Sequence, residues 1–388
     1  MTAHNEQALL ADITVLDMSQ FLAGPMAALR LGDLGARVIK IERPDGGDLC
    51  RRLYLSDTEI GGDSTLFHAI NRGKESFAGN MKDADDLAAI RALIAKADVV
   101  IQNFRPGVIE RLGLDYESAR KINPRIVYGS ISGYGPAEDW AHFPGQDLLA
   151  QARSGVMWLN GEAADGPVPF GLAVADMLAG NVLVQGILAG LVRRGMSGEG
   201  VHVETSLMEA MIDFQFEVLA THLNDGGRRP QKSAVRNAHA YLAAPYGVYE
   251  CKEGWLALAM TPLPALAPHF DLPALSGFTP AEAFSKRDEI KATIAARLRE
   301  KTAREWLAIL EPADIWAAEV LDWPNLIATA AFRQLDMLQT VTRGDGVSVR
   351  TTASPIRVNG HRHKDGRAAP LIGSQSDEIR AEFLASGR

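Results

Sequence analysis

The chain has 388 residues, of which 47% are hydrophobic and 23% charged, and its 40 Lys+Arg against 48 Asp+Glu give a formal net charge of −8. This length predicts about two domains, each with a sizeable core. The acidic balance argues against nucleic acid as the main partner, because chains that bind nucleic acid are usually strongly basic. Any anionic ligand therefore has to be met by a local cluster of basic groups.

The cysteines and the N-terminal residues indicate the cellular compartment that we expect for this chain. Cys50 and Cys251 lie far apart in the sequence, so we predict neither a disulfide framework nor a metal site. The start, MTAHNEQALLADITVLDM, lacks the basic and apolar regions of a signal peptide. The longest uncharged run, residues 177–192, is shorter than the roughly 20 residues of a membrane span. We expect a soluble, cytoplasmic protein with no membrane partner.

The first part of the chain alternates short apolar segments with amphipathic ones. The predicted strands are residues 13–17, 37–42, 98–104 and 124–132, and the predicted helices between them are residues 23–35 and 83–97. This alternation with short connections predicts an α/β fold, in which helices cover a parallel sheet. Ligands of such sheets bind beyond the carboxyl ends of the strands.

Residues 171–193, GLAVADMLAGNVLVQGILAGLVR, predict a buried helix, since apolar residues recur at helical spacing. Gly180, Gly186 and Gly190 permit close approach by a neighbouring element. The first turn carries Asp176, where the macrodipole and the free N–H groups favour an ionised carboxylate. Such a carboxylate can be a nucleophile or an ordinary helix N-cap, and this stretch alone does not decide between them.

The character of the sequence changes after this helix. Residues 199–227 predict a strand followed by a long helix, residues 228–240 are polar and basic, and residues 241–330 mix short strands with proline-rich turns and helices. We predict that residues 1–227 form the first part of a large domain. Residues 228–335 then form a smaller α+β domain, and residues 336–388 return to the large one.

Basic residues follow several of the predicted strands. Arg43 ends the second strand, Lys74 closes Asn71-Arg72-Gly73-Lys74, and Arg105 lies in NFRPG after the third strand. Together such groups bind the several phosphates of a large anionic cofactor, with forked contacts from Arg and point contacts from Lys. The alternative is that each is a solvated surface charge.

Other residues suggest weaker hypotheses. Glu42 ends the second strand, where dinucleotide-binding proteins place a ribose-binding acid, but the turn DMSQFLAGP has no Gly-x-Gly-x-x-Gly, so NAD is not favoured. In the glycine-rich segment 132–155, Gly135 allows close approach of the backbone to a ligand. His142 and Gln146 are the polar side chains expected to face a crevice there, although a lone loop histidine is also typical of a surface position.

Taken together, these motifs resemble the class III coenzyme A transferases, the family of formyl-CoA transferase, carnitine CoA-transferase and the related α-methylacyl-CoA racemases. The matching segments are residues 15–25, 31–51, 71–76, 102–135, 145–155, 173–180, 198–211 and 370–373. NFRPG and AVADMLAG, in this order and at this spacing, carry most of the specificity. The resemblance covers nearly the whole chain and is strongest over residues 13–225.

The resemblance implies a large domain with a Rossmann-like core, a smaller domain, and an interlocked homodimer. It places Asp176 on the nucleophilic aspartate of the family. It places Arg43, Lys74 and Arg105 on positions that hold the adenosine-phosphate end of CoA, and we add Gly135 and Gln146 as CoA-binding candidates. The implied substrates are an acyl-CoA donor and a small carboxylic acid acceptor, with no metal. Asp176 would attack the thioester and carry CoA as an enzyme-bound thioester.

Three departures from the family bear on the reaction. The racemases carry a histidine where this chain has Gly145-Gln146-Asp147. Racemisation needs an acid and a base on opposite faces of a carbon, and Gln146 can be neither, so transfer is favoured unless His142 takes part. Leu22 stands where formyl-CoA transferase has a glutamine, and AMTPLPA (residues 259–265) replaces its glycine-rich loop. A larger or more apolar acid is therefore as expected as formate or oxalate. A racemase or other CoA-thioester isomerase, and a catalytically silent CoA-binding protein, remain as alternatives.

Overall fold

The computed structural model describes residues 8–384, which form two compact units. The larger unit contains the described residues up to Ala150, then Ala173–Phe214, then the described residues from Arg333 onward; the smaller contains Gln151–Leu172 and Gln215–Phe332. The sequence analysis assigns residues 151–172 and 215–227 to the large domain, whereas in the structure they cluster with the smaller unit. Hydrogen bonds explain the difference: Ala163 N donates to Ser233 O, and Gln215 Nε2 donates to Ser154 O.

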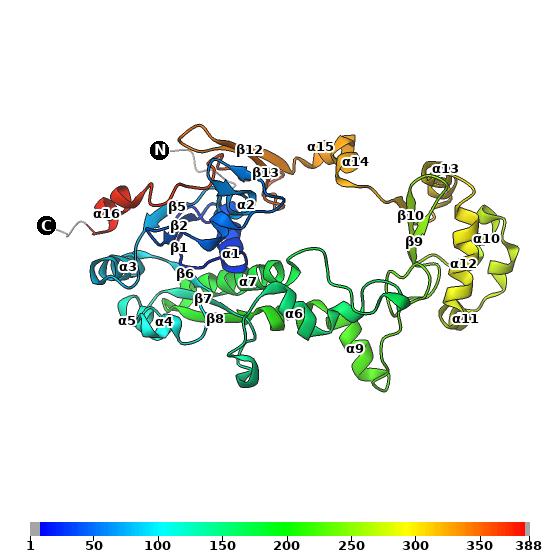
Figure 1. The fold of residues 1–388 in the computed structure, drawn as a ribbon, viewed down its shortest axis with the longest axis horizontal. Helices are drawn as coiled ribbons and strands as arrows, with labels where there is room; N and C mark the ends of the chain where they lie inside the picture. Colours follow the sequence, from blue (N-terminus) through cyan, green and yellow to red (C-terminus); the bar gives the residue numbers. More distant parts are fainter. Residues whose placement is uncertain (1–7, 385–388) are drawn as a thin grey trace. The chain divides into compact units, whose positions relative to one another are not determined.

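The larger unit is built on a six-stranded parallel sheet (Figure 1). Its strands are β1 (Thr14–Asp17), β2 (Arg37–Glu42), β5 (Glu75–Ala78), β6 (Val99–Gln102), β7 (Val127–Ser132) and β8 (Val201–Ser206). The spatial order β5-β2-β1-β6-β7-β8 is that of a Rossmann fold, in which the strand order reverses between β1 and β6 and ligands bind at the carboxyl ends beside that point. The predicted α/β class and parallel sheet are confirmed. Strand β5 is not among the strands predicted from the sequence.

Helices cover both faces of this sheet. Helices α1 (Ala23–Asp33) and α7 (Val174–Ser197) lie on one face, and α3 (Ala84–Lys96), α5 (Tyr116–Ile122) and α16 (Ser376–Leu384) lie on the other. Consecutive residues of β7 show this division, because Gly129 faces Leu183 and Ile187 of α7 while Tyr128 packs against Tyr116 of α5.

The three glycines of α7 have the predicted role of permitting close contact. A Cβ added at Gly180 would lie 2.7 Å from the carbonyl oxygen of Ala23, and one at Gly186 would lie 2.4 Å from Val203 Cγ1. A Cβ at Gly190 would lie 2.8 Å from Val201 Cγ1. By length and composition alone α7 is apolar enough to cross a membrane, but a helix that packs on a sheet passes the same test. Its contacts with α1, β7 and β8 account for that composition.

The remaining elements of the larger unit are shorter. They are η1 (Leu49–Arg52), β3 (Glu59–Ile60), β4 (Asp63–Ser64), α2 (Thr65–Asn71), α4 (Val108–Arg111), η2 (Glu138–Trp140), α8 (Leu207–Phe214), β12 (Leu338–Thr342) and β13 (Ser348–Thr352). Helix α6 (Asp147–Ser154) begins in this unit and leads into the smaller one. Cys50 and Cys251 are both free and buried.

The smaller unit combines a three-stranded antiparallel sheet with helices. Its strands, in spatial order, are β11 (Ala317–Glu319), β10 (Trp255–Leu258) and β9 (Gly247–Glu250). The helical segments are η3 (Val156–Trp158), η4 (Ala163–Asp165), α9 (Phe216–Asn224), α10 (Leu263–Phe270), η5 (Pro273–Gly277), α11 (Pro280–Ser285), α12 (Arg287–Leu298), α13 (Ala303–Leu310), η6 (Glu311–Ala313) and α14 (Trp323–Ala328), with α15 (Ala330–Leu335) leading back to the larger unit. Trp306 is fully buried at the centre of the core, and its Nε1 donates to Leu298 O.

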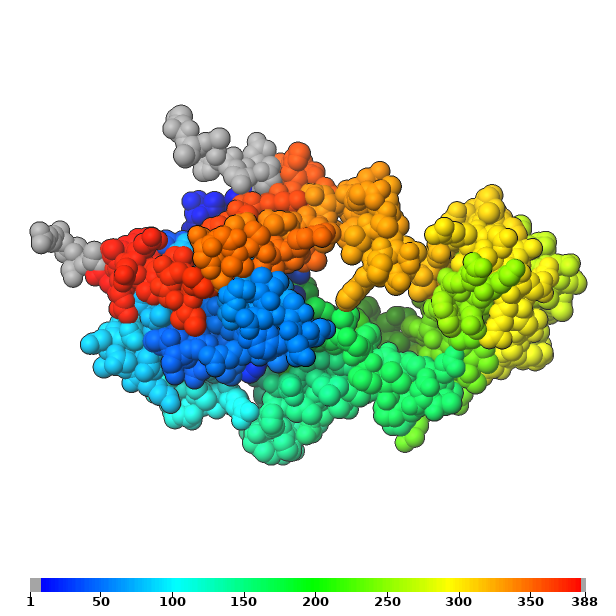
Figure 2. All heavy atoms as spheres, turned by 45° about the horizontal axis from the view of Figure 1, so that its top comes forward, coloured from blue at the N-terminus to red at the C-terminus, as the bar shows by residue number. Residues whose placement is uncertain are grey.

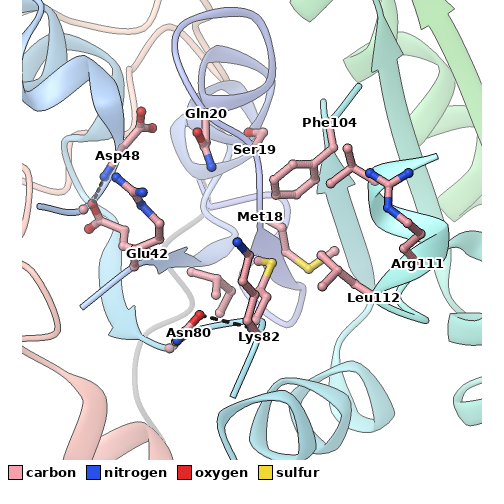
Figure 3. A pocket seen from close by; sticks show the side chains of 16 residues that line it. Met18, Ser19, Gln20, Glu42, Asp48, Asn80, Lys82, Phe104, Arg111 and Leu112 are labelled. Atoms are coloured by element: carbon pink, nitrogen blue, oxygen red, sulfur yellow. Dashed lines mark hydrogen bonds between the residues drawn. The ribbon is translucent and has the colours of Figure 1, made fainter. Parts of the chain in front are cut away.

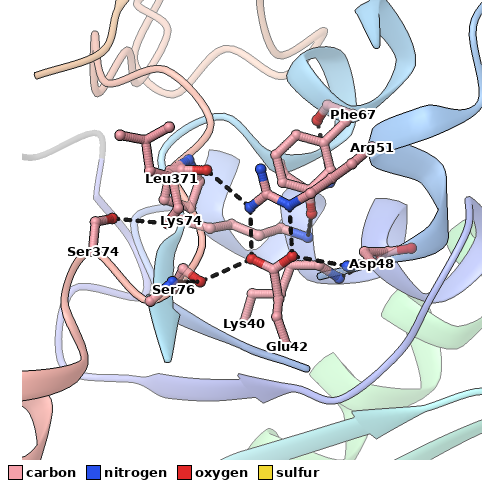
Figure 4. Close-up of polar contacts among 12 residues, drawn as sticks. Lys40, Glu42, Asp48, Arg51, Phe67, Lys74, Ser76, Leu371 and Ser374 are labelled. Carbon is pink, nitrogen blue, oxygen red and sulfur yellow. Dashed lines mark hydrogen bonds and ion pairs between the residues drawn. The ribbon is translucent and has the colours of Figure 1, made fainter. Parts of the chain in front are cut away.

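A group of buried charges ties the C-terminal segment to the sheet (Figure 4). Arg51 donates to both oxygens of Glu42, at 2.7 and 2.8 Å, and to Asp63 Oδ1 at 2.9 Å. Asp63 Oδ2 accepts from Arg343 Nη1 at 3.0 Å, so one carboxylate joins arginines that lie far apart in sequence. In the space-filling view, the orange and red C-terminal residues accordingly lie against the blue N-terminal ones (Figure 2).

We predict that Asp63→Asn destabilises the larger unit by about 3 kcal/mol, because it leaves two buried guanidinium groups short of a charged partner. Urea unfolding at pH 7 measures the change. The matched control is Asp345→Asn, which removes the more exposed carboxylate bonded to the same Arg343, and its expected cost is below about 1 kcal/mol. Equal losses of stability in the two variants would contradict the role of Asp63 as the buried link between Arg51 and Arg343.

Candidate active site

A cavity of about 390 Å³ lies at the carboxyl ends of β1, β2, β5 and β6. Its walls come from the last residues of β2 and from the segments that follow these strands: Met18–Gln20, Ile41–Arg43 with Gly47 and Asp48, Gly79–Lys82, and Phe104 with Val108, Arg111 and Leu112. Figure 3 shows the apolar side chains of Phe104 and Leu112 facing the polar side chains of Glu42 and Asp48 across it. The cavity therefore occupies the place where the strand order predicts a ligand.

Buried charges fix the wall that follows β1. Lys40 Nζ donates to the carbonyl oxygen of Ser19 at 2.9 Å and lies 2.8 Å from Asp48 Oδ2. Asp17 Oδ1 accepts from Ser19 N at 3.0 Å. Burial favours the neutral forms of these groups, but Lys40 and Lys74 hold the pKa of Asp17 below its usual value. Asp17 and Asp48 likewise keep the pKa of Lys40 above its usual value, so Asp17 and Lys40 are ionised.

Three basic residues line the cavity. Arg43 follows β2, Lys82 follows β5, and Arg111 lies at the end of α4. All three are exposed, and within residues 8–384 none of their side chains forms an ion pair. The predicted Arg43 is thus at the cavity, whereas Lys82 and Arg111 were not predicted from the sequence. Lys82 could have been found by its position after β5, had that strand been identified. The predicted Arg105 is exposed and directly follows the cavity residue Phe104.

Lys74 lies away from this cavity. It is 3% exposed, and its Nζ donates to Asp17 Oδ2 at 2.7 Å, to Pro25 O at 2.8 Å and to Asn71 Oδ1 at 2.9 Å. Burial lowers the pKa of Lys74 to about 8, and the interaction with Asp17 partly offsets that effect. In this structure the ammonium group is fully used in holding β1 and α1, and its contact with CoA stays a prediction.

Glu42 is unsuited to the ribose-binding role considered in the sequence analysis. Its Oε1 accepts from Arg51 Nη2 and Ser76 Oγ, and its Oε2 accepts from Arg51 Nε and Asp48 N, at distances of 2.7–3.0 Å. These four hydrogen bonds use the acceptor capacity of the carboxylate. The residue therefore holds Arg51, Ser76 and the backbone of Asp48 together at the edge of the sheet.

Asp176 is the third residue of α7, and a different carboxylate caps that helix. Asp147 Oδ1 accepts from Ala175 N at 2.7 Å and from Asp176 N at 3.2 Å. The N-cap position is Ala173, so Asp176 is not an ordinary N-cap. Burial, and then the charge of Asp147, raise the pKa of Asp176 to about 7. The expectation that the N–H groups of the first turn stabilise the ionised form of Asp176 is not met, because Asp147 takes two of them and the pKa is raised.

Helix α7, which carries Asp176, packs on α1, the helix that follows the β1 wall of the cavity. Gly180 lies one helical turn after Asp176 on the same side of α7 and packs against Ala23 at the start of α1. Ala23 in turn follows the turn Ser19–Leu22, whose Ser19 and Gln20 line the cavity. Gln20 N and O are both held by the Asn103 side-chain amide at 2.8 Å. Helix α1 and the turn before it thus connect the helix that carries Asp176 to the basic cavity.

The other predicted residues lie in the loops between β7 and α7. Gly135 has φ +64°, and a Cβ there would lie 2.9 Å from Glu209 Oε2, so the position requires glycine. Gln146 is exposed, and its carbonyl oxygen accepts from Leu149 N and Ala150 N at the start of α6. His142 is exposed, with its ring 4.2 Å from that of Phe143. None of the three lines the cavity, and their roles stay predictions.

Comparisons with known proteins identify the family. Residues 10–376 match the family model described as CoA-transferase family III. The chain belongs to CoA-transferase family III. It is 32% identical to acetyl-CoA:oxalate CoA-transferase of Acetobacter aceti, covering 96% of this chain and 95% of that protein. It is also 32% identical to succinyl-CoA:mesaconate CoA-transferase of Haloarcula marismortui, covering 97% of this chain and 95% of that one.

Solved structures agree with this assignment. The fold matches a CAIB/BAIF family protein from Brucella suis with a TM-score of 0.82 and 29% identity, covering 96% of this chain and 98% of that one. It matches Rv3272 from Mycobacterium tuberculosis with a TM-score of 0.81 and 27% identity, covering 95% and 98%. The protein is therefore a class III CoA-transferase. Within residues 8–384, no group of three or more His, Cys, Asp or Glu is arranged to hold a metal ion.

We predict that Asp176→Asn stabilises the enzyme in a pH-dependent way. A carboxyl group with a raised folded-state pKa binds its proton more tightly when folded, so ionising it costs stability as the pH rises. The variant should match wild type below pH 4, gain between pH 4 and 8, and level off above, by at most about 4 kcal/mol before solvent screening reduces the effect. Denaturant unfolding at several pH values measures the difference, and a gain independent of pH would contradict the raised pKa.

Proposed function

We propose that this enzyme moves CoA from an acyl-CoA thioester to a carboxylic acid through a covalent intermediate on Asp176. The observation that carries the proposal is that Asp176, a carboxylate of raised pKa, lies in the first turn of α7, which packs on the helix that follows the turn lining the basic cavity. The names of the relatives support it, because each names an acyl-CoA donor and a carboxylate acceptor. A pKa near 7 leaves much of the group ionised at neutral pH and makes it more nucleophilic than an ordinary carboxylate.

The cavity is proposed to hold the adenosine-phosphate end of CoA. Arg43, Lys82 and Arg111 surround it, and Arg105 lies next to it, so forked guanidinium groups and one ammonium group are available for phosphate oxygens. Met18, Phe104 and Leu112 offer an apolar surface for the adenine ring. Gly135 and Gln146, in the loops before and at the start of α6, are kept as candidates for contacts with CoA.

The proposed chemistry proceeds through two anhydrides. An Asp176 carboxylate oxygen attacks the thioester carbonyl, the C–S bond breaks, and CoA leaves as a thiolate from a mixed anhydride. The thiolate attacks the aspartyl carbonyl, which releases the donor acid and leaves CoA as a thioester on Asp176. The acceptor carboxylate then displaces the thiolate to form a second anhydride. Attack of the thiolate on the acceptor carbonyl gives the new acyl-CoA and regenerates Asp176.

Racemisation is the less favoured alternative. It needs an acid and a base on opposite faces of the α-carbon, whereas the Gln146 amide can be neither and His142 lies against Phe143 in an exposed loop. Incorporation of deuterium from D₂O at the α-carbon, with no change of acyl group, is the result that would select racemisation over transfer.

We predict that Asp176→Asn lowers CoA exchange by about 10³-fold or more while leaving CoA affinity within about twofold, since the amide cannot form the anhydride. The assay uses a panel of acyl-CoA donors and an acid panel containing oxalate, mesaconate and glutarate, with product acyl-CoA measured chromatographically. Asp139→Asn, which changes an exposed carboxylate of the η2 segment, is the matched control and should retain activity. Retention of more than a tenth of the exchange by Asp176→Asn contradicts the proposal. A wild type that binds CoA but exchanges nothing also contradicts it, and selects the silent CoA-binding protein.

The phosphate site gives a separate prediction. Arg111→Ala and Lys82→Ala should each weaken CoA binding about tenfold, or about 1.4 kcal/mol, because each removes a charged phosphate contact. Isothermal titration with CoA and with 3′-dephospho-CoA separates the groups: a residue that contacts the 3′-phosphate loses its effect with the shorter ligand. Arg120→Ala, an exposed arginine of α5 outside the cavity, should bind like wild type. A comparable loss of CoA affinity in Arg120→Ala would contradict the assignment of Lys82 and Arg111 as phosphate contacts.

We also propose that the enzyme is an interlocked homodimer. The support is the exposed apolar surface of α7, where Val192 is 67% and Met196 is 86% exposed, since monomers rarely leave such side chains grouped in water. Sedimentation equilibrium should give twice the chain mass of 41.9 kDa, and a monomer at micromolar concentration would contradict this. The cytoplasmic location, and the expectation that neither nucleic acid nor a membrane is a partner, stay predictions.

A further inference from the structure

Asp147 and Asp176 form a pair of carboxylates at the start of α7. Asp147 Oδ1 accepts from the N–H groups of Ala175 and Asp176, at 2.7 and 3.2 Å. We propose that Asp147 is a positioning residue for CoA transfer, which fixes the first turn of α7 and occupies the N–H groups that would otherwise bond to Asp176. This inference rests on the proposed role of Asp176 as the nucleophile.

The position of Asp147 is itself closely defined. Gly145 packs against Gly133 so tightly that a Cβ on either would lie 2.6 Å from the Cα of the other. Gly133 follows β7 and its carbonyl oxygen accepts from Met208 N at 3.1 Å, which anchors it to the start of α8. Asp147 comes two residues after Gly145 and begins α6. The carboxylate is therefore presented to α7 from a segment docked on the sheet.

The electrostatic consequence follows from which group receives the N–H donors. The first N–H groups of a helix and the positive end of its macrodipole stabilise a nearby anion. Here two of those donors point to Asp147, so Asp176 loses them and also meets a second negative charge. The titratable or charged groups on the elements packed against α7 are Arg30 and Asp33 of α1, Tyr128 of β7, His202 and Glu204 of β8, and Glu209 and Asp213 of α8. Only Asp147 adds to the effect of burial in raising the pKa of Asp176.

A more basic carboxylate is the stronger nucleophile once it is ionised. Asp147 thus favours attack on the thioester above about pH 7 and suppresses it below, where Asp176 holds its proton. A residue that merely capped the helix would contribute to stability and would leave the pH dependence of the attack unchanged. The two roles separate in Asp147→Asn, because the amide oxygen still accepts from the two N–H groups but carries no charge.

The test measures the titration of Asp176 with and without the charge at position 147. The effect of Asp176→Asn on the free energy of unfolding is followed against pH, first in the wild-type background and then in the Asp147→Asn background. This pair of curves gives the pKa of Asp176 without any turnover. In parallel, kcat/KM for CoA transfer is measured against pH in wild type and Asp147→Asn. The matched control is Asp115→Asn, which changes the cap of α5, where Asp115 Oδ1 accepts from Ser118 N.

We expect Asp147→Asn to move both the stability midpoint and the acid limb of kcat/KM down by about one pH unit. Its plateau kcat above about pH 8 should fall severalfold while the KM for acyl-CoA stays within about twofold. Asp115→Asn should change stability alone. Unchanged midpoints in an active Asp147→Asn enzyme overturn the inference and leave the proposed function intact. If Asp147→Asn shifts the stability midpoint but the wild-type enzyme transfers no CoA, the proposed function is overturned instead.

Discussion

The buried ion pair between Lys40 and Asp48 is the interaction on which the candidate site depends. Both side chains are almost fully inaccessible, and Lys40 also contacts the carbonyl oxygen of Ser19 and lies 3.7 Å from Asp17. It therefore joins the ends of β1 and β2 to the turn that walls the cavity. Leaving one buried charge without its partner costs several kcal/mol, so this edge of the sheet has one arrangement. Helix α1 begins directly after that turn, and α7 packs on α1 through Gly180.

The distribution of charge separates structural cations from those available to a ligand. Lys40, Arg51 and Lys74 are buried and bonded to carboxylates. Arg43, Lys82 and Arg111 are exposed around the cavity and, in the part of the chain that the structure describes, have no acidic partner. An acidic chain of net charge −8 thus presents a local basic site. Glu42 stands where a nucleotide-binding acid is expected, but its carboxylate is bonded to the buried Arg51 and so holds the edge of the sheet.

Elements with a local sequence pattern could be predicted from the sequence. Features that depend on contacts between residues far apart in the chain are seen only in the structure. Apolar runs predicted β1, β2, β6 and β7, and the glycine spacing predicted the close packing of α7. The four residues of β5 formed too short a pattern, and Lys82 was missed with it. Arg43 and Lys74 look alike in sequence, yet only Lys74 finds three buried oxygen atoms. The ionisation of Asp176 could not be predicted, because Asp147 lies 29 residues earlier in the chain and reaches α7 only through the fold.

The central claim is that CoA becomes bonded to Asp176 during turnover. The most direct measurement is mass spectrometry of the wild-type enzyme after brief incubation with an acyl-CoA donor and no acceptor acid, with acid quenching, proteolysis and a parallel hydroxylamine treatment. The account predicts a CoA adduct on the peptide that carries Asp176, and its conversion to a hydroxamate at the same residue. Exchange of CoA at full rate with that peptide unmodified, or with the adduct on another residue, would contradict it.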